Sequence, residues 1–530
     1  MAQPSRRAVL GMLGAVPLAA GGVLTSGAAA SAASTDSTPT GSGLASRIQG
    51  IIERPVFAGS RWGMAFTAAD TGHIVYALRP DELFVAASSF KVFIAGTAFE
   101  ALGPDRRFHT RVYRTGPVVR GVLRGDLVLV AGGDLLLSGR RRPDGTLDLP
   151  DPDPTNLGGV PLPDPLGEIR HLAGQVVAAG IRRVEGRILV DASLFREARE
   201  GIAIGDTKIT VSPMMVGDHV VHAVVTPGGG AGAAGVVRAS PQTGYVRFFS
   251  QVTTVPASGP ARPLTFGDDV VSPDGSRTVA VTGDIPLGSQ PRYVAYFVPN
   301  PTRFAGTVLA EALHALGVPI AGGIEAALAG WRGARVAEHV SPPLSEQVKV
   351  MLKVSSNVHT VTFPYLVGAV AGRDSITPKA TYEQYRRRLF REAGLDSDPT
   401  GAADGAYTAD TFIRFLTHLK RRPYFARYRQ ALPIMGRDGS LAGNQPNSPA
   451  AGHVYAKTGT GGLATPTGGA MLHKALAGYI ELPDRRWLAF AQFMRQETTF
   501  ETVRALGGQA QEAMAEIATA VYETLARSPR

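Results

Sequence analysis

The pattern of apolar and polar positions changes character twice along this chain of 530 residues. Near its start, two apolar stretches on either side of a Gly-containing turn predict a strand pair over residues 62–69 and 73–78. An apolar run then predicts a helix over residues 86–101. From about Phe108 to Glu338 the pattern becomes strand-rich and is interrupted by Gly and Pro. Only two stretches there favour helices, 166–179 and 303–316.

After about His339 the helical pattern returns. Four helices are predicted, over residues 344–354, 358–370, 379–393 and 408–420. Three strands follow, over residues 454–456, 475–482 and 487–494, and a last helix spans 501–527. Apolar residues recur in that helix at intervals of three or four positions, at Ala510, Met514, Ile517, Val521 and Leu525. Its polar face is not markedly basic, so we expect the stripe to pack on a sheet and not on a membrane surface.

The first 30 residues have the pattern of a signal peptide. Arg6 and Arg7 precede an apolar run, and Ala28–Ala30 offers a cleavage site of small residues. The paired arginines resemble a twin-arginine export signal. A membrane anchor is disfavoured because the run is short, rich in Gly and Ala, and interrupted by Pro17. We therefore predict an exported chain without a membrane span after cleavage, with residues 31–46 as a flexible lead-in.

Composition limits the function classes. The length favours two or three domains, and 44% hydrophobic with 18% charged residues is typical of a globular protein. There is no cysteine, which excludes disulfides and thiolate chemistry. The net charge is +10, and near +8 without Arg6 and Arg7. The basic runs Arg140–Arg142 and Arg386–Arg388 are interpreted as solvated surface. Because no basic stripe is interleaved with aromatic residues, nucleic-acid binding is not expected.

Three short motifs in order carry the candidate chemistry: Ser88-Ser89-Phe90-Lys91, Ser355-Ser356-Asn357 and Lys457-Thr458-Gly459. S-x-x-K, S-x-N and K-T-G in this order are typical of serine enzymes that act on penicillins and D-Ala-D-Ala peptides. Residues three apart share a helix face, so Ser88 and Lys91 are expected side by side at a helix N-terminus. A neutral lysine could then take the serine proton. Burial and a second cation, Lys457, would lower the Lys91 pKa.

The chain resembles the D-alanyl-D-alanine carboxypeptidase/endopeptidase penicillin-binding proteins of peptidase family S13. The long gap between Ser88 and Ser355 matches that family, in which extra domains follow the S-x-x-K helix, and it is too long for a class A β-lactamase. Four further stretches resemble family motifs: Gly125–Asp134, Gly186–Ser193, Ser341–Leu344 and Gly436–Leu441. In the last of these, Ser440 replaces the usual Thr and keeps the hydroxyl. The stretch from Gly461 to Gly469 is interpreted as a long loop that could alter specificity.

This resemblance implies an α/β (α+β) fold. A serine β-lactamase/transpeptidase-like catalytic domain at residues 47–107 and 339–530 would be interrupted by a β-rich insertion, 108–338, of two small domains. It implies an acyl-enzyme on Ser88, with Lys91 as general base and Ser355 as proton relay. Asn357, Lys457, Thr458, Gly459 and Thr460 would bind substrate, and the backbone N–H groups of Ser88 and Thr460 would form the oxyanion hole. No metal or organic cofactor is expected.

The resemblance also implies partners and a location. These are peptidoglycan stem peptides as substrates, β-lactams as covalent inhibitors, and the cell wall, periplasm or extracellular space as the site of action. The net positive charge makes anionic wall polymers a further expected binding partner. Two alternatives share the motifs: a β-lactamase or esterase, and a catalytically silent wall-binding or antibiotic-sensing protein. Nucleotide binding by Gly230-x-Gly232-x-x-Gly235, which matches a dinucleotide-binding fingerprint, is not expected because the pattern does not lead into a helix. Metal binding by His219 and His222 is not expected because the two side chains would point to opposite faces of a strand.

Overall fold

The computed structural model describes residues 39–202, 207–328, 330–395, 405–465 and 468–527. The predicted signal peptide lies outside these ranges. The described residues form two compact units. The first holds the chain up to Glu100, Thr207 and everything from Tyr385 onward, and the second holds Ala101–Ile202 and Lys208–Gln384. The domain boundaries expected near residues 107 and 339 stay a prediction. No helix in the described ranges is both long and apolar enough to cross a bilayer.

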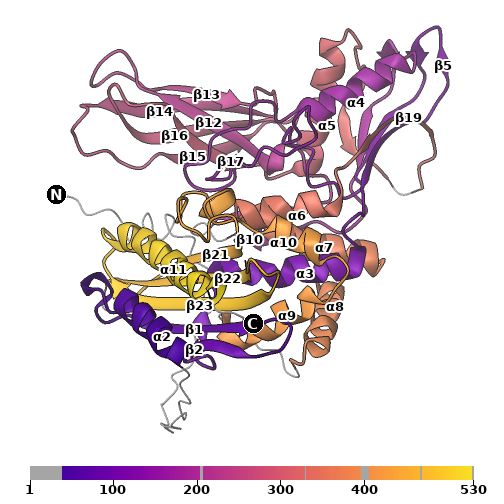
Figure 1. Cartoon of the computed structure of the whole chain (residues 1–530). Coiled ribbons are helices and arrows are strands. Elements are labelled where there is room, and N and C mark those ends of the chain that lie inside the picture. The colour runs from indigo at the N-terminus through magenta and orange to yellow at the C-terminus, as the bar shows by residue number, and fades with distance from the viewer. Residues whose placement is uncertain (1–38, 203–206, 329, 396–404, 466–467, 528–530) are drawn as a thin grey trace. The chain divides into compact units, whose positions relative to one another are not determined.

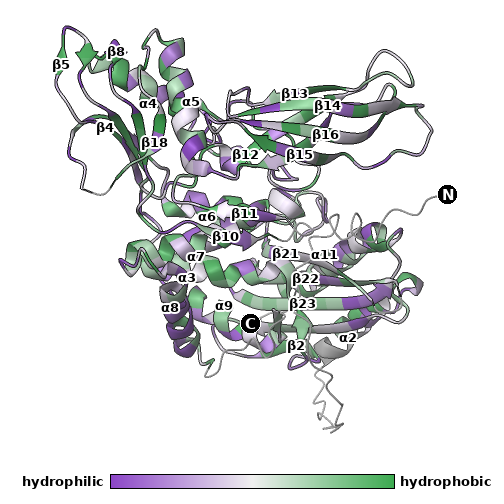
Figure 2. Cartoon of the chain, turned by 180° about the vertical axis from the view of Figure 1, so that it is seen from behind, coloured by the Kyte–Doolittle hydropathy of each residue, from purple (hydrophilic) through white to green (hydrophobic). Residues whose placement is uncertain are grey.

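A five-stranded antiparallel sheet forms the centre of the first unit, in the order β2-β1-β23-β22-β21 (Figure 1). The strands are β1 Arg61–Ala68, β2 Ile74–Leu78, β21 Val454–Ala464, β22 Ala470–Glu481 and β23 Trp487–Thr498. Most residues of β22 and β23 are buried, and Figure 2 shows both strands as hydrophobic along most of their length. Such continuous apolar runs are expected for strands with both faces covered.

Helices cover both faces of this sheet. Figures 1 and 2, seen from opposite sides, show α2 Pro39–Ile52 and α11 Val503–Ala526 on one face, and α3 Lys91–Leu102 and α9 Ala409–Lys420 on the other. The predicted stripe of α11 is confirmed: four of its members are buried in the core shared with the sheet, and Leu525 packs against that core. Shorter elements complete the unit: η1 Pro55–Phe57, η2 Ala87–Phe90, β3 Phe84–Val85, β20 Ala406–Tyr407, α10 Phe425–Ala431 and η4 Gly439–Leu441.

Two sequence predictions about this unit are wrong. Part of the expected flexible lead-in, residues 39–46, belongs to α2, because Leu44 and Ile48 are buried in the core with α11. The expected long loop after Thr460 is shorter than predicted, because Gly461–Ala464 belongs to a strand. β21 continues to Ala464, and Gly461–Ala464 pairs in register with Ala470–His473 of β22. Backbone hydrogen bonds to a neighbouring strand stabilise this pairing even where side chains are small.

The second unit is built mainly from sheets. Its largest sheet has the order β18-β9-β7-β4-β19, and helices α4 Gly167–Ala178 and α5 Pro301–Ala315 pack on it, close to where helices were predicted. The strands of this sheet are β4 His109–Arg114, β7 Leu127–Val130, β9 Ile188–Asp191, β18 Ile324–Ala326 and β19 Ala334–Val340. One apolar core joins this sheet and its helices to the strands that follow β9.

Smaller sheets make up the rest of this unit. Their orders are β13-β12-β17, β14-β16-β15, β5-β6-β8 and β10-β11. These strands are β5 Val118–Val119, β6 Val122–Leu123, β8 Arg183–Val184, β10 Ala198–Gly201, β11 Lys208–Val211, β12 Val220–Thr226, β13 Val236–Ser240, β14 Val246–Val255, β15 Thr265–Val271, β16 Arg277–Pro286 and β17 Arg292–Phe297. Two further helices of this unit have the bounds α6 Leu344–Lys353 and α7 Asn357–Ala371, and a third, α8 Pro378–Glu392, begins in this unit and ends in the first. These helices match the predicted stretches closely.

Candidate active site

Ser88 lies in the turn η2, immediately before α3. The helix predicted over residues 86–101 therefore begins later than expected, at Lys91, whose backbone N–H donates to the carbonyls of Ser88 and Ser89. Ala87 has a φ of 44°, in the left-handed region that side chains with a Cβ rarely adopt. Ser88 is half-buried and Lys91 is only 1% exposed. A strained backbone next to a serine one turn from a buried lysine is typical of a functional site.

Strand β21 packs directly against this turn. A Cβ added at Gly459 would lie 2.5 Å from the carbonyl oxygen of Ala86 and 3.2 Å from the backbone nitrogen of Ser89. No side chain fits there, so only glycine lets the strand approach the turn this closely. Two positions further on, a Cβ at Gly461 would meet Ala87 at 3.5 Å, an ordinary contact distance. The first unit thus brings Ser88 and the K-T-G motif together through Gly459.

The two side chains before Gly459 are held by local contacts. Lys457 is fully buried, and its Nζ donates to the carbonyl oxygen of Thr458 at 3.0 Å. The hydroxyl of Thr458 lies 2.8 Å from the Ser440 hydroxyl in η4. Ser440, which stands where the family motif usually has threonine, therefore supplies the hydroxyl that contacts Thr458. This links the motif Gly436–Leu441 to the K-T-G strand.

Another buried lysine, Lys474, lies next to Thr460 in the sheet. Lys474 is directly opposite Thr460 in the pairing of β21 with β22, and its Nζ donates to Thr460 Oγ1 at 2.6 Å. It also donates to Gln511 Oε1 of α11 at 3.0 Å. Burial lowers the pKa of Lys474 to about 7. Lys474 is not among the predicted site residues, although a lysine within an otherwise apolar strand is a signal for a functional site.

The S-x-N motif belongs to the second unit, at the junction of α6 and α7. Ser355 lies between the two helices with a φ of 57°, and Asn357 is the first residue of α7. The Asn357 side chain donates to Asn156 Oδ1 at 3.3 Å. The buried Ser356 hydroxyl lies 2.9 Å from His359 Nδ1 and 3.3 Å from the Thr155 hydroxyl. These contacts tie the motif to the loop at residues 153–156.

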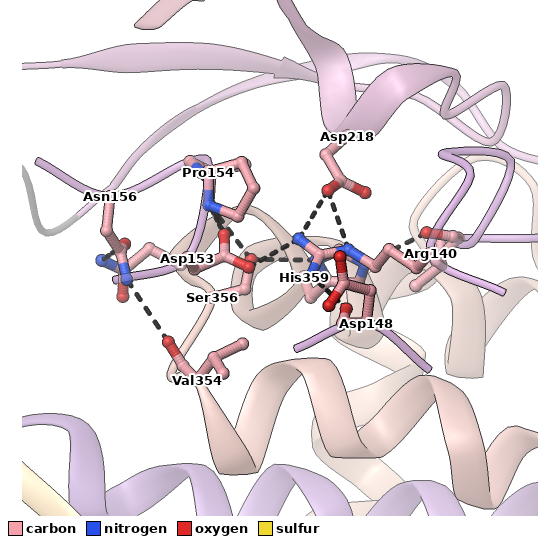
Figure 3. Close-up of polar contacts among 12 residues, drawn as sticks. Arg140, Asp148, Asp153, Pro154, Asn156, Asp218, Val354, Ser356 and His359 are labelled. Carbon is pink, nitrogen blue, oxygen red and sulfur yellow. Dashed lines mark hydrogen bonds and ion pairs between the residues drawn. The ribbon is translucent and has the colours of Figure 1, made fainter. Parts of the chain in front are cut away.

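A buried ion-pair network anchors that loop (Figure 3). The Arg140 guanidinium has no solvent exposure and contacts Asp153 and Asp218 at 2.6 Å each. Burial opposes its charge, but the two carboxylates outweigh burial and raise the Arg140 pKa. The interpretation of Arg140 as solvated surface is therefore wrong. The sequence could not reveal this, because Asp153 and Asp218 lie 13 and 78 residues away and meet at Arg140 only in the folded chain.

Of the two histidines discounted as a metal site, His222 lies on a strand as expected and His219 does not. Residues 217–219 form the turn η3 before β12 rather than part of a strand, and Asp218 and His219 both have left-handed φ values. The turn aims the Asp218 carboxylate at Arg140. His222 contacts the Pro154 carbonyl through Nε2 at 2.9 Å. Among the described residues, no group of three His, Asp or Glu side chains is arranged to hold a metal ion.

The fold places the chain in a known class. Its structure matches that of penicillin-binding protein 4 from Haemophilus influenzae, with a TM-score of 0.66 at 18% identity over 91% of this chain and 99% of that one. The same protein in complex with a β-lactam gives a TM-score of 0.63. The expected fold class, a serine β-lactamase/transpeptidase-like domain with β-rich additions, is confirmed.

The sequence comparison defines the family. The D-Ala-D-Ala carboxypeptidase 3 (S13) family model matches residues 44–521, and the chain belongs to this family. It is 29% identical over 472 residues to a D-alanyl-D-alanine carboxypeptidase of Actinomadura sp. (strain R39), which covers 84% of this chain and 79% of that one. It is 22% identical over 430 residues to DacB of Haemophilus influenzae. The expected enzyme class, a serine-type D-Ala-D-Ala carboxypeptidase, is confirmed.

Replacing Gly459 should damage the site while a matched glycine tolerates the same change. In Gly459→Ala the new methyl group collides with backbone atoms of the Ser88 turn, so β21 must shift. We expect the rate of covalent labelling by benzylpenicillin to fall about 100-fold, the scale of an ångström-sized misplacement. Gly461→Ala, with ordinary contacts, should react at close to the wild-type rate. Equal rates for the two variants would refute the close-approach argument.

The buried Arg140 network predicts a stability difference between two aspartates. Asp218→Ala leaves a buried guanidinium with one carboxylate and should lower the free energy of unfolding of the second unit by about 3 kcal/mol. Asp148→Ala removes only the partner of the exposed Arg142 and should cost less than about 1 kcal/mol. Urea unfolding, monitored by hydrogen exchange of the α7 amides, measures the stability loss of each variant. Similar losses in both variants would contradict the assignment.

The Lys474 pKa predicts how stability depends on pH. An unfolded lysine stays protonated to about pH 10, whereas folded Lys474 loses its proton near pH 7. Between these values the unfolded state binds more protons, so the stability of the wild type rises with pH. Below pH 7 Lys474 is charged in the folded state, and burial of that charge destabilises the wild type most. Lys474→Met should therefore gain most over wild type below pH 7 and lose that gain by about pH 10.

Thermal unfolding of both proteins across this pH range measures the effect. The same substitution at the exposed Lys208 is the control. A difference between wild type and Lys474→Met that does not change with pH would show that Lys474 does not titrate as its burial implies.

Proposed function

We propose that this chain is a penicillin-sensitive carboxypeptidase/endopeptidase that hydrolyses peptidoglycan stem peptides through an acyl-enzyme on Ser88. The observation that carries the proposal is the contact between the K-T-G strand and the Ser88 turn. It requires glycine at position 459 and puts the backbone of residues 457–460 beside the serine. An extended substrate that adds along this strand would bring its D-Ala carbonyl to Ser88.

In the first chemical step, the Ser88 hydroxyl attacks the carbonyl carbon of the penultimate D-Ala. Lys91 begins the helix after the serine, is buried, and takes the serine proton as general base. The negative charge that develops on the carbonyl oxygen is stabilised by the backbone N–H groups of Ser88 and Thr460. A C–O bond forms, the peptide C–N bond breaks, and water later releases the shortened peptide.

Substrate recognition is assigned to the remaining motif residues. Lys457 supplies positive charge for the terminal carboxylate, and the hydroxyls of Thr458 and Thr460 donate to it. Gly459 keeps the strand close enough for these contacts. By the S-x-N motif, Ser355 passes a proton to the leaving nitrogen and Asn357 binds the substrate backbone. The strained φ of Ser355 supports a functional role for this turn.

The site of action is part of the same proposal. The leader at residues 1–30 has the features of an export signal, and a substrate in the cell wall requires export. The net positive charge would favour contact with anionic wall polymers. Haemophilus influenzae penicillin-binding protein 4 has been solved with a bound β-lactam, which supports penicillin as a covalent inhibitor of this chain.

Intact-mass measurement after mixing with benzylpenicillin tests the nucleophile. The wild type should gain the mass of one penicillin, at a site that peptide mapping places on Ser88, and Ser88→Ala should gain none. Ser89→Ala is the matched control. Its hydroxyl is buried and donates to the Ala86 carbonyl at 2.7 Å, so this variant should still be labelled.

The time course separates the alternatives. A stable adduct together with release of D-Ala from a pentapeptide supports the proposal. A transient adduct with penicillin consumed would indicate a β-lactamase. A folded wild type that neither forms an adduct nor releases D-Ala would indicate a silent wall-binding or sensing protein.

A further inference from the structure

Lys474 places an amino group, positively charged below about pH 7, within reach of the proposed substrate strand. Its side chain is 3% exposed and its ammonium donates to Thr460 Oγ1 at 2.6 Å. Thr460 itself is exposed and follows the K-T-G motif directly. The Thr460 hydroxyl therefore lies between the Lys474 ammonium and a substrate bound along β21.

The ammonium lacks a negatively charged partner in the described part of the chain. Its two contacts are the Thr460 hydroxyl and the Gln511 amide oxygen, and both are neutral. Lysine is seldom fully buried unless it is paired, because an uncompensated charge in the interior is costly. Arg140 of the second unit, by contrast, has two carboxylates. An anion that binds next to Thr460 would supply the compensation that Lys474 lacks.

The hydrogen bond from Lys474 also leaves the Thr460 hydroxyl free to donate toward the solvent side of the strand. An ammonium group can only donate, so the Thr460 oxygen must be the acceptor in this pair. The hydrogen of the Thr460 hydroxyl is then left to donate to another group. A hydroxyl that accepts from a cation is a stronger donor in turn. Because Thr460 is exposed, an anionic acceptor can reach it from the solvent side of the strand.

The same lysine connects to the other hydroxyl of the strand. Gln511 accepts from Lys474 and donates through Nε2 to the Ser440 carbonyl at 2.9 Å. The Ser440 hydroxyl in turn contacts Thr458 Oγ1. Lys474 and Gln511 thus fix the surroundings of both threonines from the side of the sheet covered by α11.

We propose that Lys474 is a positioning residue and the second cation of the carboxylate subsite, acting through Thr460 to select substrates that end in a free carboxylate. The inference rests on the proposed acyl transfer at Ser88. Lys474 does not touch the substrate. It orients the Thr460 hydroxyl and adds to the charge of Lys457, so it should affect capture of the carboxylate end and not the acylation chemistry.

Matched substrates test this selection. Two D-Ala thioesters are used, one whose leaving group ends in a carboxylate and one whose leaving group ends in the corresponding amide. In Lys474→Met, kcat/KM should fall at least about tenfold on the carboxylate substrate and by less than about twofold on the amide, the effect expected when a charge-assisted contact is lost. The loss should lie in KM. On a Thr460→Val background, Lys474→Met should cause no further loss of selectivity.

Each other outcome contradicts the inference. Equal loss on both substrates would show that Lys474 is only structural, and no loss on either would show that it does not serve the subsite. If Lys474→Met does not fold, Lys474→Gln, which keeps a donor but no charge, should show the same carboxylate-selective loss. A wild type that leaves both thioesters intact overturns the proposed function and this inference together. Turnover in the wild type with unselective loss in the variant overturns the inference alone.

Discussion

The strand β21 can lie against the turn of Ser88 only because position 459 has no side chain. A Cβ there would lie 2.5 Å from a backbone oxygen, and backbone atoms cannot be moved aside as a flexible side chain can. The rest of the first unit keeps both partners of this contact in place. The turn continues into α3, and β21 is held by β22, which is buried between helices. Ser88, the proposed nucleophile, and the K-T-G strand are thus positioned by backbone contacts, which vary less than those made by side chains.

The buried cations Arg140 and Lys474, one in each unit, differ in the charge of their partners. In the second unit, Arg140 is matched by two carboxylates, and the network secures the loop that contacts the S-x-N motif. In the first unit, Lys474 is given neutral partners only. The first arrangement stabilises the fold, because each charge is compensated within the protein. In the second arrangement no carboxylate among the described residues compensates the charge, and in our proposal a bound substrate carboxylate does so.

Much of this architecture was predictable from the sequence. Ser88, Lys91 and Lys457–Gly459 lie in short segments whose spacing reflects chemistry, and the α11 stripe reflects burial of a helix face on a sheet. The failures share a cause, since each depends on a contact that forms only in the folded chain and that the local pattern does not encode. Residues 39–46 are helical because Leu44 packs with α11, Gly461–Ala464 extend the sheet because β22 pairs with them, and Arg140 is buried because Asp153 and Asp218 fold onto it.

The most direct test of the central claim is a crystal structure of the protein with a boronic acid that mimics the D-Ala-D-Ala transition state. We expect a covalent bond from Ser88 Oγ to boron and a boronate oxygen between the backbone N–H groups of Ser88 and Thr460. The inhibitor carboxylate should lie on the hydroxyls of Thr458 and Thr460. A bond to another residue, or an inhibitor lying away from β21, would contradict this claim.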